Sequence, residues 1–287
     1  MANPALRNRL EAGEFILAPG IYDGLSALCA DGMDFGALYL TGYGTSASLL
    51  ARPDSGYLTA THMADRVRTL CGAINTPLIA DADTGFGGLI NVEAAVQDYE
   101  RAGASGIQLE DQLFPKRCGH TKNREVIGRD EAVAKIRMAA EARESRDFLI
   151  VARTDAYASH GLDECFARAE GFLEAGADIL FIESPAREEE LEAIAKRFEG
   201  AWLIANMVEG GTTPILPSET LKALGFSIAI YPVAGLAAAA AALQSVYAGL
   251  KSNDAIEGAR LEFSELNQLI GFERIWALDA RFGKDMD

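Results

Sequence analysis

Eight short apolar runs, alternating with longer stretches of helical periodicity, constrain most strongly what this chain can fold into. The runs span residues 15–18, 37–40, 77–80, 106–109, 148–151, 179–182, 202–205 and 227–230. Each is nearly all apolar, and several begin at or just after a glycine or proline, which is typical of parallel strands buried on both faces. Eight such strands, each followed by a helix, predict a (β/α)8 TIM barrel. A doubly wound open sheet is the alternative, but no GxGxxG motif follows the first run.

The stretches between the runs carry helical patterns, most clearly at residues 92–102, 130–144, 162–175 and 188–198. Two of them end in Ala-Gly-Ala, at Gly103 and Gly176, where glycine suits the left-handed residue that closes a helix. The chain has 287 residues and 49% hydrophobic content, which is enough for one large core. Because no linker or composition break divides it, we expect a single barrel domain over residues 1–287.

A further helical pattern, from about residue 253 to residue 287, follows the eighth strand–helix unit. Its apolar positions include Leu261, Phe263, Leu266, Leu269, Ile270, Ile275, Trp276 and Leu278. A helix left over after a barrel has closed must bury such side chains elsewhere, because apolar surface is stabilised by leaving water. We therefore expect this extension to pack on a neighbouring subunit of an oligomer.

The charge balance excludes two classes of partner. The chain carries 26 Lys and Arg against 42 Asp and Glu, a formal net charge of −16. Such a surface repels nucleic-acid phosphates and anionic membranes, so we expect neither as a partner. The longest weakly charged run, residues 227–250, is interrupted by Pro232 and Gly235. It predicts a buried strand followed by a tightly packed helix rather than a membrane span.

Cysteine usage and the first residues indicate the compartment. The four cysteines form no CxxC pair, which favours reduced thiols over a disulfide scaffold. Residues 1–20 show no apolar core or cleavage site of a secretory signal. We expect a cytoplasmic protein.

Polar residues gather where the predicted strands end. They lie at residues 41–44, 81–87, 110–112, 153–155, 183–184 and 206–211. The active sites of (β/α)8 barrels sit at the carboxyl ends of the strands. Polar groups at so many strand ends therefore predict a ring of charged side chains around one mouth of the barrel.

Carboxylates in this ring suggest a metal site. Asp81 and Asp83 are two residues apart, so on one strand their side chains would share a face. Glu110 would come from the neighbouring strand, and sparse carboxylates suit Mg²⁺. A plain polar turn at Asp83 is the alternative, although Asp81 lies in apolar sequence and needs a partner. At the next strand end, Arg153 could clamp a carboxylate or form a structural ion pair with Glu110 or Glu183.

The segment Lys116-Arg117-Cys118-Gly119-His120 follows the fourth run. A thiol beside two cations and an imidazole has reason to lower its pKa and act as an acid or a nucleophile. The glycine indicates a mobile loop. A Cys–His acyl-transfer pair is conceivable, but a mouth rich in carboxylates argues against a protease-like site. An inert buried thiol is the alternative.

Four segments together resemble the isocitrate lyase/phosphoenolpyruvate mutase superfamily. They are DADTGFG at 81–87, EDQ at 110–112, KRCGH at 116–120 and ARTDA at 152–156. The resemblance covers nearly the whole chain. It implies a (β/α)8 barrel that uses Mg²⁺, with Mn²⁺ as a possible substitute. It also implies a homotetramer, a dimer of dimers, with the C-terminal helix exchanged between neighbouring subunits.

Because it contains a cysteine, the KRCGH loop resembles the corresponding loop of the carbon–carbon lyases rather than that of the phosphonate-forming mutases. The resemblance implies that a 2-hydroxy acid binds the metal through its carboxylate and hydroxyl and is cleaved to an α-keto acid and an enolate. Asp83 is then the principal metal ligand, and Asp54, Asp81 and Glu110 act partly through water. Cys118 is then the acid that protonates the enolate carbon.

The same resemblance implies the remaining site residues. The further catalytic candidates are Tyr39, Arg153, His120 and Lys116. The candidates for substrate binding are Thr41, Gly42, Tyr43, Arg117, Gly119, Glu183 and Asn206. Among these, Tyr39, Thr41, Gly42 and Tyr43 would line the end of the pocket that holds the keto acid.

Chain length favours the branch of 2-methylisocitrate and 2,3-dimethylmalate lyases, because isocitrate lyases carry long insertions. Residues 204–214 and 263–267 resemble the dimethylmalate lyase and petal-death-protein subgroup more closely. An oxaloacetate hydrolase giving oxalate and acetate is the alternative, although Pro232 stands where such relatives usually have serine. A non-catalytic binding barrel is a second alternative, which the intact set of acids, cations and thiol disfavours.

Overall fold

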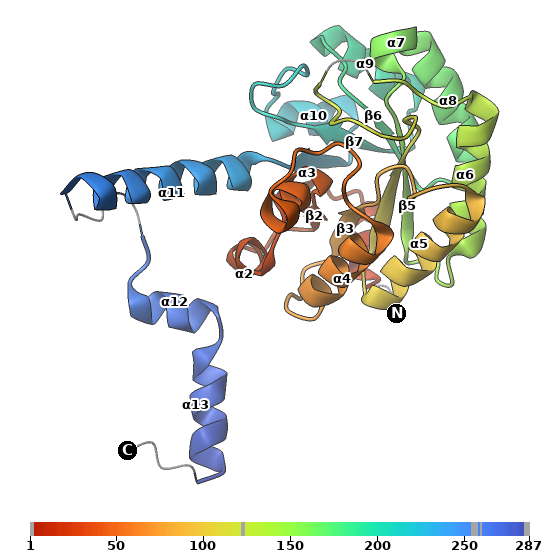
Figure 1. Ribbon diagram of the computed structural model, residues 1–287. Helices are drawn as coiled ribbons and strands as arrows, with labels where there is room; N and C mark the ends of the chain where they lie inside the picture. Colours follow the sequence, from red (N-terminus) through yellow and green to blue (C-terminus); the bar gives the residue numbers. More distant parts are fainter. Residues whose placement is uncertain (1–2, 122–123, 254–257, 259, 284–287) are drawn as a thin grey trace. The chain divides into compact units, whose positions relative to one another are not determined.

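The computed structural model describes residues 3–121, 124–253, 258 and 260–283. Eight parallel strands close a barrel in chain order, and the last strand pairs with the first (Figure 1). They are β1 (Ile16–Ile21), β2 (Leu38–Leu40), β3 (Leu78–Asp81), β4 (Gly106–Glu110), β5 (Leu149–Thr154), β6 (Ile179–Ile182), β7 (Trp202–Asn206) and β8 (Ile228–Tyr231). Each overlaps one of the eight apolar runs, so the predicted barrel is confirmed.

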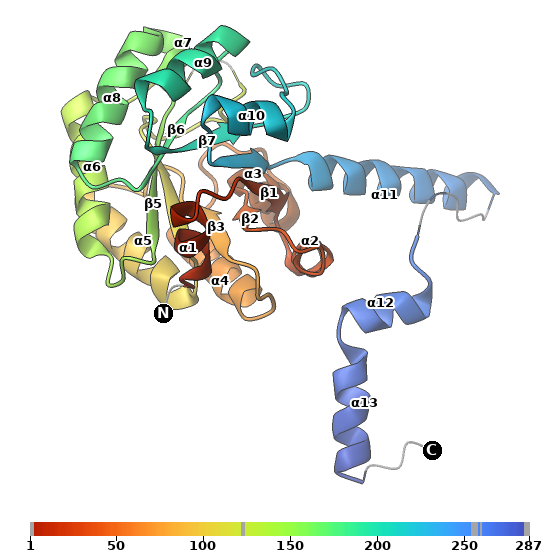
Figure 2. The same cartoon turned by 180° about the vertical axis from the view of Figure 1, so that it is seen from behind.

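Helix α1 precedes the first strand, and the helices that follow the strands cover the outside of the barrel (Figures 1 and 2). In the barrel they are α1 (Ala5–Glu11), α2 (Gly24–Asp31), α3 (Gly42–Thr45), the π-helix η1 (Ser46–Leu50), α4 (Ala60–Cys71), α5 (Leu89–Ala102), α6 (Arg129–Ala142), α7 (Tyr157–His160), α8 (Leu162–Glu174), α9 (Glu188–Arg197) and α10 (Ser218–Leu224). The four clearest predicted helices correspond to α5, α6, α8 and α9. Gly103 and Gly176 take φ values of 101° and 99°, so the glycines expected to end helices do so in the left-handed region.

Two apolar layers explain why the strands appear as continuous apolar runs. Along β5, Leu149 and Val151 belong to the cluster that fills the barrel, whereas Ile150 and Ala152 belong to the cluster under the helices. Alternate residues thus face opposite layers, and both layers consist of apolar side chains. Leu6 and Leu10 of α1 join the inner cluster. Arg7 of α1 binds the Arg146 carbonyl, before β5, and Asp178, before β6. Helix α1 therefore lies at the amino ends of the strands, opposite the carboxyl ends that carry the polar site.

The chain divides by internal contacts into two compact units, Met1–Leu236 and Ala237–Asp287. The second contains most of α11 (Ala234–Asn253), together with α12 (Phe263–Leu269) and α13 (Phe272–Arg281). The extension expected from about residue 253 lies in this unit, and residues 254–257, 259 and 284–287 are outside the described part.

The expectation of a tightly packed helix after β8 is wrong for the described chain. On α11, Leu243 is 51% exposed and Tyr247 is 63% exposed. The low charge of this segment predicted burial, but these side chains have no apolar cover within the described chain. None of the described helices combines the length and the hydropathy that crossing a bilayer requires.

Candidate active site

The carboxyl ends of the strands bring the predicted polar residues to one mouth. Asp81 ends β3, Glu110 ends β4, Arg153 lies in β5, Glu183 follows β6 and Asn206 ends β7. All five are at most 8% exposed. The register pairs Glu110 with Arg153 across β4 and β5. Parallel strands end at the same edge, so a sequence pattern at strand ends becomes a cluster in space.

Asp83 departs from the prediction. We expected it on the same strand as Asp81, but β3 ends at Asp81, and Asp83 has a φ of 49° in the following turn. The two carboxylates still lie together. A side chain at Gly42 would place its Cβ 2.7 Å from an Asp81 oxygen and 3.4 Å from an Asp83 oxygen. Glycine at position 42 is therefore required by the close approach of these acids.

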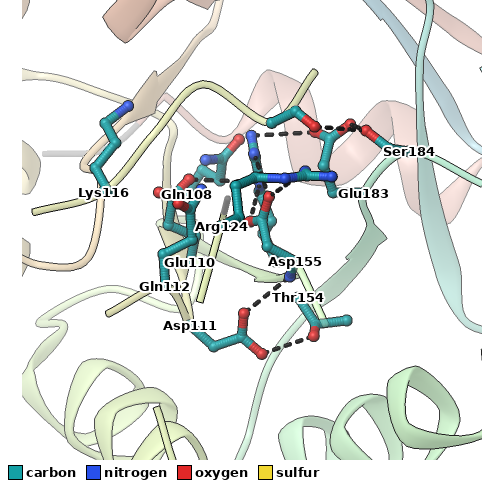
Figure 3. A network of polar contacts seen from close by, with 12 residues as sticks. Gln108, Glu110, Asp111, Gln112, Lys116, Arg124, Thr154, Asp155, Glu183 and Ser184 are labelled. Atoms are coloured by element: carbon teal, nitrogen blue, oxygen red, sulfur yellow. Dashed lines mark hydrogen bonds and ion pairs between the residues drawn. The ribbon is translucent and has the colours of Figure 1, made fainter. Parts of the chain in front are cut away.

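Lys116 neutralises part of this acidic cluster. Its Nζ atom lies 2.6 Å from Oδ1 of Asp54 and 2.6 Å from Oδ1 of Asp83. The lysine is 2% exposed, and nearby carboxylates raise its pKa well above the usual value although burial opposes them. Lys116 lies apart from Asp155 and Glu183 (Figure 3). The lysine of the KRCGH segment therefore forms ion pairs with these acids instead of lowering the pKa of the Cys118 thiol.

Asp81 is held by protein donors on both oxygens. Oδ1 accepts hydrogen bonds from the backbone of Asp83 and from the side chain of Gln108, at 3.0 and 3.1 Å. Oδ2 accepts from the backbone N–H of Gly42 at 3.2 Å. Gln108 in turn accepts a hydrogen bond from the Tyr39 hydroxyl. The sequence analysis missed Gln108, whose signal was a polar residue inside a buried strand.

The carboxylate oxygens of this acidic cluster are suitable ligands for a hard divalent cation. Oε1 of Glu110 is buried and has no hydrogen-bond partner among the described residues. Burial raises the pKa of Asp83 to about 7, with Lys116 opposing the rise. No three His, Cys, Asp or Glu side chains of the described residues are gathered closely enough to hold a metal. The Lys116 ammonium lies within 2.6 Å of two of the acids, Asp54 and Asp83. Carboxylate oxygens that already hold one cation have the chemistry that Mg²⁺ requires.

Arg153 forms more ion pairs than we expected. It binds Asp155 through two hydrogen bonds of 2.8 and 2.9 Å. It also lies 3.4 Å from Glu110 and 3.2 Å from Glu183, so both predicted structural pairs exist. Its guanidinium carbon is 5.1 Å from the centre of the Phe181 ring. The arginine is therefore fixed in place at the mouth before any ligand binds.

Asp155, the partner of Arg153, belongs to a buried polar network that includes Asp111, Arg124 and Thr154 (Figure 3). Asp155 also binds Arg124 at 2.9 Å and donates its backbone N–H to Asp111 at 2.8 Å. Asp111 accepts from the Thr154 hydroxyl and pairs with Arg168 of α8 at 3.1 Å. The sequence analysis did not assign this network, because its members lie up to 57 residues apart.

The loop after β4 is folded onto the mouth. A Cβ on Gly119 would lie 2.3 Å from Nη2 of Arg153 and 2.8 Å from Glu183. The Gly119 carbonyl accepts a hydrogen bond from the Ser184 hydroxyl at 2.7 Å. Only a residue without a side chain fits between the loop and these charges, which explains the glycine of KRCGH.

The imidazole ring of His120 lies beside residues at the ends of β6 and β7 and in the segment after β7. Nδ1 accepts from the backbone N–H of Thr212 at 3.2 Å, and Nε2 lies 3.3 Å from Glu183 and 3.2 Å from the Asn206 amide. Burial lowers its pKa, so it is neutral with its proton on Nε2. Among the described residues, its ring nitrogens contact these groups and not the Cys118 thiol. The Cys–His pair is therefore not formed.

The thiol of Cys118 does not have the lowered pKa that we expected. Burial raises its pKa, the His120 N–H opposes the rise, and Asp54, Arg153 and Glu183 act on it through space. The prediction failed because sequence neighbours need not be spatial neighbours. A protonated thiol surrounded by the charges of the mouth can donate a proton.

Three candidates occupy less central places. Thr41 is buried and its hydroxyl caps α3 by accepting from Gly44 at 3.4 Å. Tyr43 is 41% exposed. The side chain of Arg117 is exposed, and the backbone of Arg117 is held by the side chain of Gln112. The structure thus does not bring Arg117 to the cluster.

A closed barrel with buried acids, a fixed arginine and a protonated thiol at its mouth defines a β/α-barrel enzyme. A family model described as phosphoenolpyruvate phosphomutase matches residues 6–251. The chain is 45% identical over 273 residues to 2,3-dimethylmalate lyase of Eubacterium barkeri, with 94% of each chain covered. It is 43% identical to 2-methylisocitrate lyase of Aeropyrum pernix, with 84% of this chain and 77% of the relative covered.

Solved structures agree over the whole chain. An oxaloacetate acetylhydrolase in complex with 3,3-difluorooxalacetate matches with a TM-score of 0.93 and 34% identity over 100% of both chains. A phosphonopyruvate hydrolase in complex with oxalate and Mg²⁺ matches with a TM-score of 0.88 and 32% identity, over 99% of this chain and 100% of the other. The protein belongs to the phosphoenolpyruvate mutase/isocitrate lyase superfamily, as the sequence motifs predicted.

Proposed function

We propose that this protein is a Mg²⁺-dependent carbon–carbon lyase. Its substrate would be a 2-hydroxydicarboxylate or tricarboxylate of the 2,3-dimethylmalate or 2-methylisocitrate type, cleaved to pyruvate and a second carboxylate. The observation that carries the proposal is the meeting of buried carboxylates and the fixed Arg153 at one mouth, against which the loop that carries Cys118 is packed at Gly119. Support also comes from the relatives named as lyases, one of them 45% identical.

The acids and the arginine would bind opposite ends of the substrate. Asp83 would be the principal ligand of the cation, and Asp54, Asp81 and Glu110 would act partly through water. The hydrogen bonds that occupy both Asp81 oxygens are consistent with an indirect role. When bound, Mg²⁺ would stabilise the negative charge that develops at the substrate oxygens.

The chain's own residues would carry the bond cleavage. Arg153 would bind a carboxylate of the substrate, and Asn206 would offer a neutral donor beside it. The substrate hydroxyl would lose its proton to a base at the mouth, and its C–O bond would become the keto group of pyruvate as the carbon–carbon bond breaks. The electron pair of that bond would go to the carbon of the departing carboxylate fragment, and the S–H proton of Cys118 would be transferred to that carbon. The thiolate left on Cys118 would then regain a proton from solvent. The loop that carries Cys118 and Gly119 would exclude water during this step.

The function is tested by pyruvate release. Purified protein with Mg²⁺ is assayed on 2,3-dimethylmalate, 2-methylisocitrate, isocitrate and oxaloacetate, and products are identified by mass spectrometry. Pyruvate from either methylated acid is the expected result. Oxalate and acetate from oxaloacetate would instead favour the hydrolase, which the similarity to the acetylhydrolase structure supports. No turnover on any of the four would favour a binding barrel.

The thiol is tested by Cys118→Ser, with Cys29→Ser as the matched control because Cys29 is an exposed cysteine. Loss of a general acid costs about 100- to 10,000-fold in rate. We expect kcat to fall within or beyond that range while the Kd for Mg²⁺ changes less than about twofold. Undiminished turnover of Cys118→Ser would remove Cys118 from the mechanism.

We also propose a homotetramer, a dimer of dimers, located in the cytoplasm. The support for assembly is exposed apolar surface on the second unit, including Phe263, Ile275 and Trp276. Side chains of this kind are stabilised by burial in an interface. The negative net charge and the four unpaired cysteines support a reducing compartment without nucleic-acid or membrane partners.

A further inference from the structure

Lys135 is a buried cation that the proposed mechanism does not use. It lies in the middle of α6 and is 8% exposed. Among the described residues, its Nζ atom donates a hydrogen bond to the backbone carbonyl of Thr84 at 3.0 Å. Within the described part of the chain, no carboxylate lies within ion-pair distance of its Nζ atom, and burial lowers its pKa. An ammonium is costly to bury without a paired carboxylate, so its position here requires a physical reason.

The carbonyl that Lys135 binds belongs to an unusual turn. Asp83, Gly85, Phe86 and Gly87 have φ values of 49°, 81°, 60° and 153°. Two of these four are not glycine, and left-handed backbone at such residues persists only where the surroundings hold it. The turn presents Asp83 to the acidic cluster, so its backbone sets where that carboxylate lies.

Three successive carbonyls of this turn are each held by a different donor. The Ala82 carbonyl accepts from Gly85 N–H at 2.9 Å, and the Asp83 carbonyl accepts from Glu110 N–H at 2.9 Å. The Thr84 carbonyl accepts from Lys135 at 3.0 Å. The first two donors are main-chain groups of the turn and of β4. The third is a side chain that reaches in from a helix.

Lys135 also lies behind the acids of the mouth. A void of about 10 Å³ is lined by Lys135 and Thr84, by Glu110 and Asp111 of the β4 end, and by Arg153. The positive charge therefore lies on the outer side of the strand whose inner side carries Glu110. A charged donor binds a carbonyl more strongly than a neutral one, and this position lets one group act on both the turn and the acids.

We propose that Lys135 is a positioning residue for the metal-binding carboxylate of Asp83. By holding the Thr84 carbonyl, it fixes the left-handed turn and thereby orients Asp83 toward the bound cation. The inference rests on the proposed function for the identity of the cation. It adds a residue of the outer helical layer to the determinants of the site.

The test compares Lys135→Met with wild type and with Lys196→Met, which removes an exposed lysine from α9. Mn²⁺ alone is the probe, and its binding to the full-length protein is measured by electron paramagnetic resonance. Hydrogen exchange of residues 82–88 and the thermal midpoint are measured without metal. We expect Lys135→Met to weaken Mn²⁺ binding at least tenfold and to exchange faster in this turn. Its midpoint should equal or exceed that of wild type, because a costly buried charge is gone.

The outcomes separate this inference from the proposed function. Wild-type protein that bound no Mn²⁺ would overturn the metal assignment and this inference together. Wild type that bound Mn²⁺ while Lys135→Met bound it equally well would overturn only the role of Lys135. A loss of affinity in step with a lowered midpoint would show a purely structural role and overturn it too. If Lys135→Met does not fold, Lys135→Arg keeps a charged donor and should bind Mn²⁺ within threefold of wild type; a larger loss in folded Lys135→Arg overturns the proposal.

Discussion

Lys116 and Cys118 are two residues apart, yet their side chains meet different partners. The lysine binds Asp54 and Asp83, whereas Cys118 is half-buried and Arg153 acts on its thiol through space. Adjacent cations in the sequence suggested a reactive thiolate. In the folded loop, desolvation outweighs them and favours the neutral thiol. At this scale, chemistry follows the spatial neighbours of a residue and not its sequence neighbours.

The pH dependence of thiol alkylation tests this difference. Iodoacetamide reacts with the thiolate. Because burial raises the pKa of Cys118, its alkylation should be slow at pH 7 and should rise only above the ordinary thiol value of about 8.5. Peptide mapping by mass spectrometry measures the rate, and exposed Cys29 is the internal reference that reacts first. Alkylation of Cys118 that already levels off by pH 7 would contradict a raised pKa.

A single methyl group tests the closed position of the loop. In Gly119→Ala the new Cβ would meet Arg153 and Glu183 at under 3 Å, and Arg153 cannot yield because Asp155 holds it. Misplacing the loop should lower kcat/KM by about 100-fold. Gly128→Ala is the control, since nothing lies within 4 Å of its added Cβ. Equal kinetics for the two variants would mean that the loop need not approach Arg153.

At the scale of elements, the loop between β4 and α6 is fastened at its base. Gln112 and Val126 form an antiparallel bridge, and the N–H of Ile127 donates to the Asp111 carbonyl at 2.9 Å. Arg124 lies in the part of the loop that leads back to α6, and it forms an ion pair with Asp155. Asp155 also pairs with Arg153. One carboxylate thus connects the loop to the arginine of the mouth.

Arg124→Ala tests this connection. Removing one partner of a buried ion pair leaves the other partly unpaired and costs about 3 kcal/mol of unfolding free energy. Arg68→Ala is the control, because the Arg68–Asp65 pair is mostly exposed and such pairs contribute about 1 kcal/mol or less. Urea denaturation measures both. A cost for Arg124→Ala no greater than for Arg68→Ala would show that the connection does not stabilise the fold.

At the scale of the whole molecule, the two ends of the barrel differ. Leu6 and Leu10 of α1 join the apolar interior near one end, and the buried acids and Arg153 occupy the other. The second unit, in contrast, exposes apolar side chains. Its helix α13 carries Phe272 and Trp276, whose rings lie 5.9 Å apart, and both side chains are more than 40% exposed.

Assembly is tested on this exposed apolar surface. If α13 packs on another subunit, Trp276→Asp should shift the mass measured by light scattering from that of a tetramer toward smaller species, because burying a charge in an interface is costly. Met33→Asp is the control, since it places the same charge at a 67% exposed position of the barrel. A tetramer that persists in Trp276→Asp would contradict the packing of α13 in the interface, and a monomeric wild type would contradict the proposed homotetramer.

The amino-acid sequence by itself determined the barrel, the family and the composition of the mouth. Strands buried on both faces must be apolar throughout, so eight runs were visible without coordinates. Parallel strands end at a common edge, so Glu110, Arg153 and Glu183 could be grouped before any distance was known. The motifs around Asp83 and Cys118 then identified the superfamily.

Only the tertiary structure decided which charges meet. Arg124 and Lys135 carried no distinct signal, because their partners lie 31 and 51 residues away. Gln108 stood out as a polar residue in a buried strand, but its partner lies 27 residues away and could not be identified. The direction of the Cys118 pKa and the left-handed backbone of Asp83 depended on burial and on close contacts. Hydrogen bonding and desolvation act over a few ångströms in space, and sequence spacing does not measure that distance.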